Sequence, residues 1–224
     1  MTTSIRISNT DLFSKDAIWP RNVGLAISKI PIRKQDGYTT AMIEKFAREL
    51  KNVVVKNGIV FLICYAPTED KARPFEVARA MTKAGFKHID NIVVKKTWHA
   101  GKRSEANLVN SHEYVMYFVK GNTWSIDRTP IHIYLNDENS VDKCCGNTWE
   151  VNTGSLGESV SIDLAELLIR LPALLPGSLV FDPFMSNSAT FLAASKLGHN
   201  FVGFEKNLKK SKKYEEILNT IKGV

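Results

Sequence analysis

The sequence predicts an α/β fold with a mostly parallel sheet, and three observations support that class. Apolar runs of strand length alternate with amphipathic helical segments along nearly the whole chain. Residues 58–66 (G-I-V-F-L-I-C-Y-A) are apolar almost throughout, as is typical of a strand buried on both faces of a parallel sheet. Residues 180–207 combine a strand, a sharp loop, a helix and a second strand that ends in an acid, which is the order of a βαβ unit.

Each expected element has a local signal. The helix at 38–58 places apolar residues such as Phe46 and Leu50 at helical spacing, and the helix at 74–86 starts at a proline and closes near Gly85. Residues 1–20 are polar and mixed and predict a loose lead-in. Strands are expected at 23–27, 58–66, 88–98, 113–121, 178–182 and just before Glu205, and further helices at 162–177, from about 188, and at 208–223.

The whole chain, 1–224, is expected to form a single domain. Its length is enough for one α/β core, and it shows neither an internal repeat nor a clear linker. Residues 122–160 are rich in Asn, Asp, Gly and Ser and show little regular pattern. We therefore expect a small irregular insertion, and the region of about 97–160 is a candidate for DNA recognition.

The net charge and the cysteines limit the kinds of function that the chain can have. The net charge of +7 favours a polyanionic partner such as nucleic acid. Cys64 lies in an apolar run and is expected in the core, whereas the adjacent Cys144 and Cys145 lack the spacing of metal ligands, so no metal site is expected. An odd cysteine count without a signal peptide suits the cytoplasm. No apolar run approaches the ~20 residues of a membrane span.

The βαβ unit at 180–207 has the layout of a nucleotide-like cofactor site. Asp182 stands where a strand ends, and a helix beginning near Ser188 points its N-terminus at the loop. Glu205 ends the next strand, where an acid can accept hydrogen bonds from two ribose hydroxyls. The pattern alone fits equally well an ordinary βαβ unit with a capping Asp and a surface Glu.

This unit resembles the S-adenosylmethionine loop of bacterial and phage DNA amino-methyltransferases, which modify adenine N6 or cytosine N4. The family's pattern is D-P-F-x-G-S-G-T-T, then A-A, L-G-R and a strand ending G-x-E. The matching residues here are Asp182, Pro183, Phe184, Ser186, Asn187, Ser188, Thr190, Ala193, Ala194, Leu197, Gly198, Gly203 and Glu205. The resemblance implies a Rossmann-like S-adenosylmethionine-dependent methyltransferase fold with a seven-stranded type of sheet. It also implies that Asp182, Phe184, Ser186, Ser188 and Glu205 hold the cofactor.

The rest of the chain follows the permuted order of this family, in which the catalytic segment precedes the cofactor loop. V-G-L-A-I-S-K-I-P resembles the strand that leads into the catalytic tetrapeptide. A-G-F-K-H-I-D-N-I-V-V-K-K-T-W resembles a later Gly-Phe and W-x-K strand, and S-H-E-Y-V-M-Y-F-V resembles its R-H-E-Y strand. The resemblance extends from Val23 to Asn219.

The catalytic tetrapeptide departs from the family pattern, which is Asp, Asn or Ser, then Pro-Pro, then an aromatic residue. Here Lys29, Ile30, Pro31 and Ile32 stand in register. A lysine donates hydrogen bonds only, so it cannot accept one from the target amine, and its charge would repel the cofactor's sulfonium. Isoleucine offers no face on which a flipped base could stack. A shift of one residue to Ser28 would restore an acceptor but not the second proline or the aromatic residue.

The cofactor loop departs as well. Ser186 and Ser188 replace two glycines, and a serine in left-handed geometry would cost on the order of 1 kcal/mol. Residues 154–163 (G-S-L-G-E-S-V-S-I-D) lack the His-Pro and Lys-Pro stretch that closes over the cofactor in the family. We therefore expect S-adenosylmethionine binding to be weak or lost.

A basic, aromatic-tipped loop is the candidate DNA contact. It comprises Lys95, Lys96, Trp98, His99, Lys102 and Arg103, which could contact phosphates and stack on bases. A solvated loop explains these residues equally well. The four lysines at 209, 210, 212 and 213 are interpreted as a solvated helix face.

Three hypotheses follow for function. The first is a DNA-binding pseudo-methyltransferase, or a supporting subunit of a restriction-modification type system, that acts as a homodimer or with an active methyltransferase. The second is an active DNA amino-methyltransferase with atypical motifs. The third is a protein-interaction scaffold. Lys29 and Ile32 favour the first over the second, and the basic charge favours it over the third.

Overall fold

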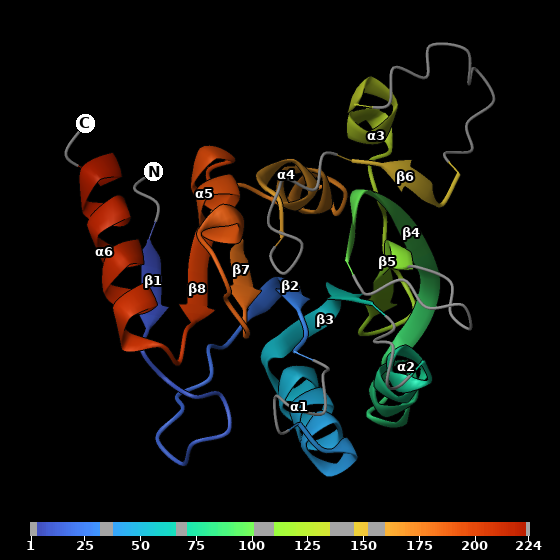
Figure 1. Cartoon of the computed structure of the whole chain (residues 1–224), viewed down its shortest axis with the longest axis horizontal. Coiled ribbons are helices and arrows are strands. Elements are labelled where there is room, and N and C mark those ends of the chain that lie inside the picture. Colours follow the sequence, from blue (N-terminus) through green and yellow to red (C-terminus); the bar gives the residue numbers. More distant parts are fainter. Residues whose placement is uncertain are drawn as a thin grey trace.

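The computed structural model describes residues 4–31, 38–65, 71–100, 110–134, 146–151 and 160–222, of which 96–100, 110, 132–134 and 220–222 are described by their backbone alone. Their strands form one sheet with helices on both faces (Figure 1). The strands are β1 (Ile5–Ser8), β2 (Val23–Lys29), β3 (Val54–Cys64), β4 (Lys87–Ala100), β5 (Asn110–Val119), β6 (Thr148–Glu150), β7 (Leu179–Asp182) and β8 (Asn200–Phe204). The helices are α1 (Thr40–Val53), α2 (Arg73–Lys83), α3 (Thr129–Tyr134), α4 (Ile162–Arg170), α5 (Ala189–Lys196) and α6 (Leu208–Lys222).

The sheet has the order β1-β8-β7-β2-β3-β5-β4-β6. Strand β5 runs antiparallel to both of its neighbours, β3 and β4, and every other pair in the sheet is parallel. The predicted α/β class with a mostly parallel sheet is confirmed. The predicted strand number is wrong, because the described sheet has eight strands rather than seven.

Two short strands were not expected from the sequence. Strand β6 has three residues, lies in the segment predicted to be irregular, and pairs with Val93, Val94 and Lys95 of β4. Strand β1 has four residues, lies in the predicted loose lead-in, and pairs with β8. Neither is long enough to show a periodic pattern, so both depend on the partner strand that the tertiary fold supplies.

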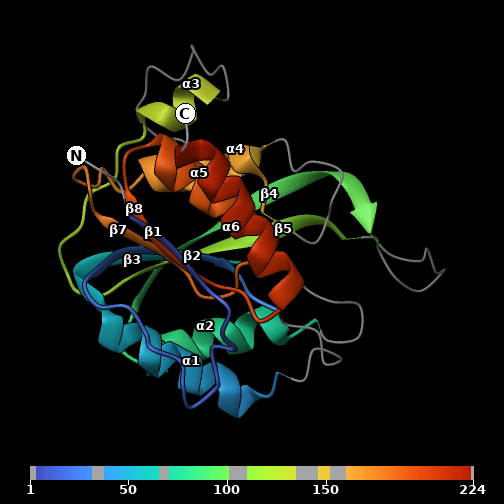
Figure 2. The same cartoon turned by 90° about the vertical axis from the view of Figure 1, so that its left-hand side faces the viewer.

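The helices cover the sheet in two layers (Figure 2). On one face, Phe46 and Leu50 of α1 and Met81 of α2 are buried against the sheet. On the other face, Leu168 of α4 and Phe191 of α5 pack into a second apolar cluster, which α6 also joins. The two-sided core explains why β3 is apolar along its length. Cys64, at the end of β3, is fully buried, as predicted.

The helix ends follow local chemistry. Thr39 caps α1 by accepting a hydrogen bond from the Met42 amide, and Ser161 caps α4 in the same way through the Leu164 amide. Helix α4 ends at Arg170 instead of reaching residue 177 as predicted, because Pro172 lacks an N–H and cannot continue the helix. Among the described residues, no helix is long and apolar enough to span a membrane.

The topology places a site at one edge of the sheet. Strand β7 pairs with β8 on one side and with β2 on the other, all parallel, so their carboxyl ends meet at this edge. Such a switch point, where the chain connections diverge, is where open α/β sheets bind ligands.

Candidate functional site

A cavity of about 280 Å³ opens at this edge, which is close to the lower end of the size range of ligand pockets. Its walls come from the segments that follow β1, β2, β7 and β8. It is lined by Thr10, Asp11, Leu12, Lys29, Ile30, Pro31, Tyr38, Tyr65, Pro183, Phe184, Met185, Ser186, Phe204, Glu205, Lys206 and Lys210. Phe184, Ser186 and Glu205 of the predicted cofactor set are among them, whereas Asp182 and Ser188 are not.

Asp182 is a buried brace beneath the cavity rather than part of its wall. One carboxylate oxygen accepts hydrogen bonds from the Ser28 hydroxyl at 2.6 Å and from the Phe184 amide at 3.2 Å, and the other accepts one from the Thr190 hydroxyl at 2.9 Å. The carboxylate therefore joins β2, β7 and α5 at one point. Burial raises the pKa of Asp182 to about 6, although the Ser28, Thr190 and Phe184 hydrogen bonds oppose that rise.

The loop between β7 and α5 is held from three directions. The Met185 amide donates to the Phe204 carbonyl, the Asn187 side chain donates to the Val160 carbonyl, and the Tyr214 hydroxyl of α6 donates to the Ser186 carbonyl. The predicted strain at Ser186 and Ser188 is absent. The described non-glycine residues with positive φ are Asn22, Asn57 and Ala173, and Ser188 lies in the right-handed region. The backbone of this loop needs no left-handed conformation at Ser186 or Ser188. The prediction that backbone strain at these serines weakens cofactor binding is therefore wrong.

Glu205 follows β8 directly and lies almost fully buried at the inner end of the cavity. Its amide donates to the Ser8 carbonyl, which ties it to β1, and its carboxylate accepts a hydrogen bond from the Asn207 amide at 2.8 Å. Gly203, two residues earlier, allows β8 to pass close to the loop, since a Cβ there would lie 2.7 Å from the Met185 sulfur. The G-x-E spacing thus places an acid at the cavity on a strand that packs tightly against the loop.

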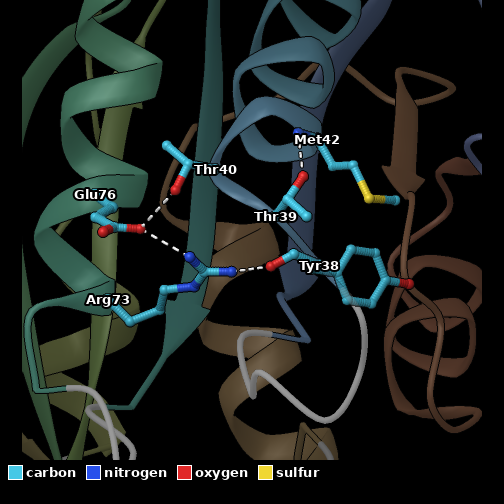
Figure 3. A network of polar contacts seen from close by, with 6 residues as sticks. All are labelled: Tyr38, Thr39, Thr40, Met42, Arg73 and Glu76. Atoms are coloured by element: carbon cyan, nitrogen blue, oxygen red, sulfur yellow. Dashed lines mark hydrogen bonds and ion pairs between the residues drawn. The ribbon is translucent and has the colours of Figure 1, made fainter.

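Tyr38 and Phe184 form an aromatic wall of the cavity that Glu205 also lines. The Tyr38 ring meets the Phe184 ring edge-on at 5.7 Å between centroids. Figure 3 shows how Tyr38 is anchored: the buried Arg73 guanidinium donates to the Tyr38 carbonyl and forms an ion pair with Glu76 at 2.8 Å, and the Thr40 hydroxyl also donates to Glu76. This network ties the first turns of α1 and α2 to the rim of the cavity.

The predicted catalytic position holds a buried ion pair. Lys29 is the last residue of β2, and its side chain passes over β3 to Glu113 of β5, with 2.6 Å between the Lys29 Nζ and the Glu113 Oε1. Both side chains are almost fully buried. Glu113 offsets the charge of Lys29, so the predicted repulsion between Lys29 and a cationic cofactor is smaller than the sequence suggested. The lysine still offers only donor groups in the place where an acceptor is needed.

Among the described residues beside Lys29, no side chain offers a free acceptor. The Ser28 hydroxyl is fully buried, and it is already bonded to Asp182 and to the Phe184 amide. Ile30 is buried and its amide donates to the Ile63 carbonyl. Pro31 lines the cavity, whereas Ile32 lies outside the described residues.

The predicted DNA loop is described only at its start. Lys95 forms an exposed ion pair with Glu150 of β6, a contact that the sequence did not indicate. The side chains of Lys96, Trp98 and His99, and all of Lys102 and Arg103, lie outside the described residues. Their role in DNA contact stays a prediction.

Sequence reasoning missed several cavity residues. Asp11 lines the cavity because it follows β1, and recognising that short strand would have drawn attention to it. Tyr38 and Tyr65 reach the cavity from the start of α1 and the end of β3, and Lys206 and Lys210 reach it from the segment after Glu205. None of these residues has a sequence signal of its own.

The profile of a family described as "DNA methylase" matches residues 31–217. The chain belongs to this DNA methylase family. A curated relative, the type II methyltransferase M2.DpnII of Streptococcus pneumoniae, is 27% identical over 174 residues, which cover 72% of this chain and 60% of the relative. The chain thus spans about 60% of the length of that relative.

Solved structures of DNA methyltransferases have the same fold as this chain. The M1.HpyAVI complex with S-adenosylmethionine aligns with a TM-score of 0.69 and 19% identity, over 95% of this chain and 99% of the other. The cytosine-N4-specific PvuII DNA methyltransferase aligns with a TM-score of 0.73 and 15% identity, over 98% and 93%. The resemblance to an S-adenosylmethionine-dependent methyltransferase fold is confirmed.

The raised pKa of Asp182 predicts a pH-dependent stability that the substitution Asp182→Asn should remove. Because the folded-state pKa of about 6 exceeds the unfolded value of about 3.9, the folded protein binds more protons between these pH values. Stability from this group is therefore full below about pH 4 and is lost as pH rises through 6. An asparagine keeps the shape without ionising. Relative to the variant, the wild type should lose about 2 kcal/mol of unfolding free energy between pH 4 and 7.

Urea unfolding at each pH, followed by circular dichroism, measures this difference. Asp182→Ala is the matched control, which should be less stable at every pH because Ser28 and Thr190 lose their partner. If the difference in unfolding free energy between the wild type and Asp182→Asn is constant across this pH range, the raised pKa of Asp182 is contradicted.

The buried Lys29–Glu113 pair predicts strong coupling in a double-mutant cycle of Lys29→Met and Glu113→Leu. Each single change leaves a buried charge without its partner and should cost about 3 kcal/mol, whereas the double variant should lose much less than the sum. Lys196 and Glu166, whose ion pair is 2.7 Å long but more exposed, form the control cycle, with coupling below about 1 kcal/mol. Additive losses at Lys29 and Glu113, measured by urea unfolding, would count against an energetically coupled pair.

Proposed function

We propose that this chain is a DNA-binding, S-adenosylmethionine-binding member of the DNA methylase family that does not itself transfer a methyl group. It would act as a supporting subunit, as a homodimer or beside an active methyltransferase. The observation that carries this proposal is the buried Lys29–Glu113 ion pair in the register position of the family's catalytic acceptor. Family membership and the cavity at the carboxyl edge of the sheet support the cofactor and the DNA substrate class.

The cavity has the groups that S-adenosylmethionine needs. Tyr38 and Phe184, whose rings meet edge-on, provide aromatic surface against which a purine ring can pack, and Glu205 is placed to accept hydrogen bonds from ribose hydroxyls. The loop at Ser186 is well supported and shows no left-handed serine. These features favour retained binding over the loss that the sequence suggested. When bound, the cofactor would supply a methyl group on a cationic sulfur.

The residues around the target position support binding without transfer. Methylation of an exocyclic amine requires acceptors that orient its nitrogen lone pair toward the methyl group. Lys29 presents an ammonium there, Glu113 holds that ammonium, and the Ser28 hydroxyl is committed to Asp182. Loss of positioning alone can reduce a rate by orders of magnitude.

The second candidate is an active DNA amino-methyltransferase with atypical motifs. The well-formed cofactor side of the cavity favours this second candidate, because an inactive chain would have no need to keep that geometry. The two candidates differ in methyl transfer and not in cofactor binding, so two separate measurements are needed.

Cofactor binding should be measurable by calorimetry. We expect the purified chain to bind S-adenosylmethionine and S-adenosylhomocysteine with micromolar affinity, and Glu205→Gln to weaken binding at least tenfold by removing a charged acceptor from the cavity. The control is Glu215→Gln on the exposed side of α6, which should bind as the wild type does. Absence of binding by a wild-type chain with a sharp thermal transition would refute the cofactor proposal.

Methyl transfer should be absent from the isolated chain. The assay uses radiolabelled S-adenosylmethionine and mixed genomic DNA without prior methylation, with and without a co-expressed methyltransferase chain. We expect no label in DNA from this chain alone, since Lys29 cannot accept a hydrogen bond from the amine. Label that depends on this chain alone and is lost on Glu205→Gln would put the active candidate first.

A further inference from the structure

The start of α6 and the residues before it carry a dense group of lysines. Lys206, Lys209, Lys210, Lys212 and Lys213 are all exposed, and we call them the α6 lysine cluster. None of the five forms an ion pair with any carboxylate of the described residues. Some exposed lysines elsewhere are paired with a glutamate, as Lys83, Lys95 and Lys196 are, and others such as Lys45 and Lys56 are not, so what distinguishes the cluster is its density beside the cavity.

The order of charges along α6 opposes helix stability. Its lysines stand in the first two turns, where the positive end of the helix dipole disfavours cations, and Glu215 and Glu216 follow them. Lys209 and Lys213 are four residues apart, and Lys210 and Lys213 three apart, so like charges face each other on the helix surface. The dipole alone would favour the reverse order, and a polyanion beside the helix would relieve the repulsion between its lysines.

The helix N-terminus itself is not the binding site. The Asn207 side chain caps it by accepting hydrogen bonds from the Lys209 and Lys210 amides. An anion would therefore meet the lysine side chains on the flank of α6 rather than the first amides of the helix.

The inner side of α6 fixes where this cluster lies. Ser211, Tyr214 and Leu218 are buried, and the Tyr214 hydroxyl holds the Ser186 carbonyl of the loop beside the cavity. Lys206 and Lys210 line the cavity itself. Figure 2 shows the start of α6 and the end of β4 toward the same side of the molecule.

We infer that the α6 lysine cluster is a contact surface for the phosphate backbone of duplex DNA, next to the cofactor cavity. This inference rests on the proposed function, because it takes DNA as the polyanion from membership of the DNA methylase family. Exposed lysines beside the cavity that form no ion pair with a described carboxylate suit phosphate contacts, which position a protein on DNA without reading its sequence.

The test variant is Lys209→Gln, Lys212→Gln and Lys213→Gln, which leaves the cavity-lining Lys206 and Lys210 in place. The control triple is Lys45→Gln, Lys56→Gln and Arg79→Gln, three exposed cations on or beside the two helices of the other face, with the same change in net charge. Fluorescence anisotropy of a labelled, mixed-sequence duplex gives the affinity of each full-length chain across about 50–200 mM salt.

We expect the α6 triple to bind duplex DNA more than tenfold weaker at about 50 mM salt, and its salt slope to flatten by about 1 for each phosphate that the lysines no longer neutralise. The control triple should change both quantities much less. Cofactor binding and the melting temperature of the α6 triple should not fall, because the three lysines lie outside the cavity and repel one another.

Equal decreases in affinity for the two triples would overturn the inference, because net charge and not α6 would then carry the effect. Unchanged DNA binding by the α6 triple would also overturn it while leaving the proposed function intact. A wild-type chain that binds no duplex even at low salt would contradict both. Single-stranded RNA that competes better than duplex DNA would overturn the choice of partner.

Discussion

The Asp182 carboxylate is the interaction on which the rest of the site depends. It gathers a hydroxyl from β2, a hydroxyl from α5 and an amide of the loop after β7, and all three donors are in place although the group is buried. The cost of this burial is visible in its raised pKa. Because the three segments meet at Asp182, the cavity mouth and the catalytic strand have fixed positions relative to each other. The aspartate connects these segments without lining the cavity, whereas Pro183 and Phe184, which follow it directly, do line it.

The two halves of the cavity have different characters. On the cofactor side, Glu205, the aromatic wall and the supported Ser186 loop form a surface able to hold a nucleoside-like group. On the other side, the Lys29–Glu113 pair occupies the position that the sequence predicts for the catalytic acceptor. Burying such a pair brings little net stability, since desolvation offsets most of the attraction. The pair is therefore not explained by stability alone, which agrees with the proposed loss of methyl transfer.

Helix α6 connects these features to the surface. Tyr214 reaches inward to the loop at Ser186, and burial, together with the nearby Glu205 and Asp182 charges, raises the pKa of Tyr214 to about 12 and keeps its hydroxyl a donor. The lysines on the same helix point away from the core and have no described acidic partner. One helix therefore supports the cofactor loop from inside and presents positive charge at the rim of the same cavity. This arrangement gives a physical route by which DNA contact and cofactor contact could influence each other.

The sequence by itself determined the α/β class, the long strands, the amphipathic helices and the positions of Glu205 and Lys29, because each rests on local periodicity or on a motif with fixed spacing. It could not determine the short strands β1 and β6, which exist only through pairing with β8 and β4. It also misjudged Ser186 and Ser188, since backbone geometry at a loop depends on the segments that hold it. Above all, only the tertiary structure decided that Lys29 meets Glu113 and that Ser28 and Thr190 meet Asp182. These partners lie 84, 154 and 8 residues apart in the chain, and only the packing of strands and helices sets such distances.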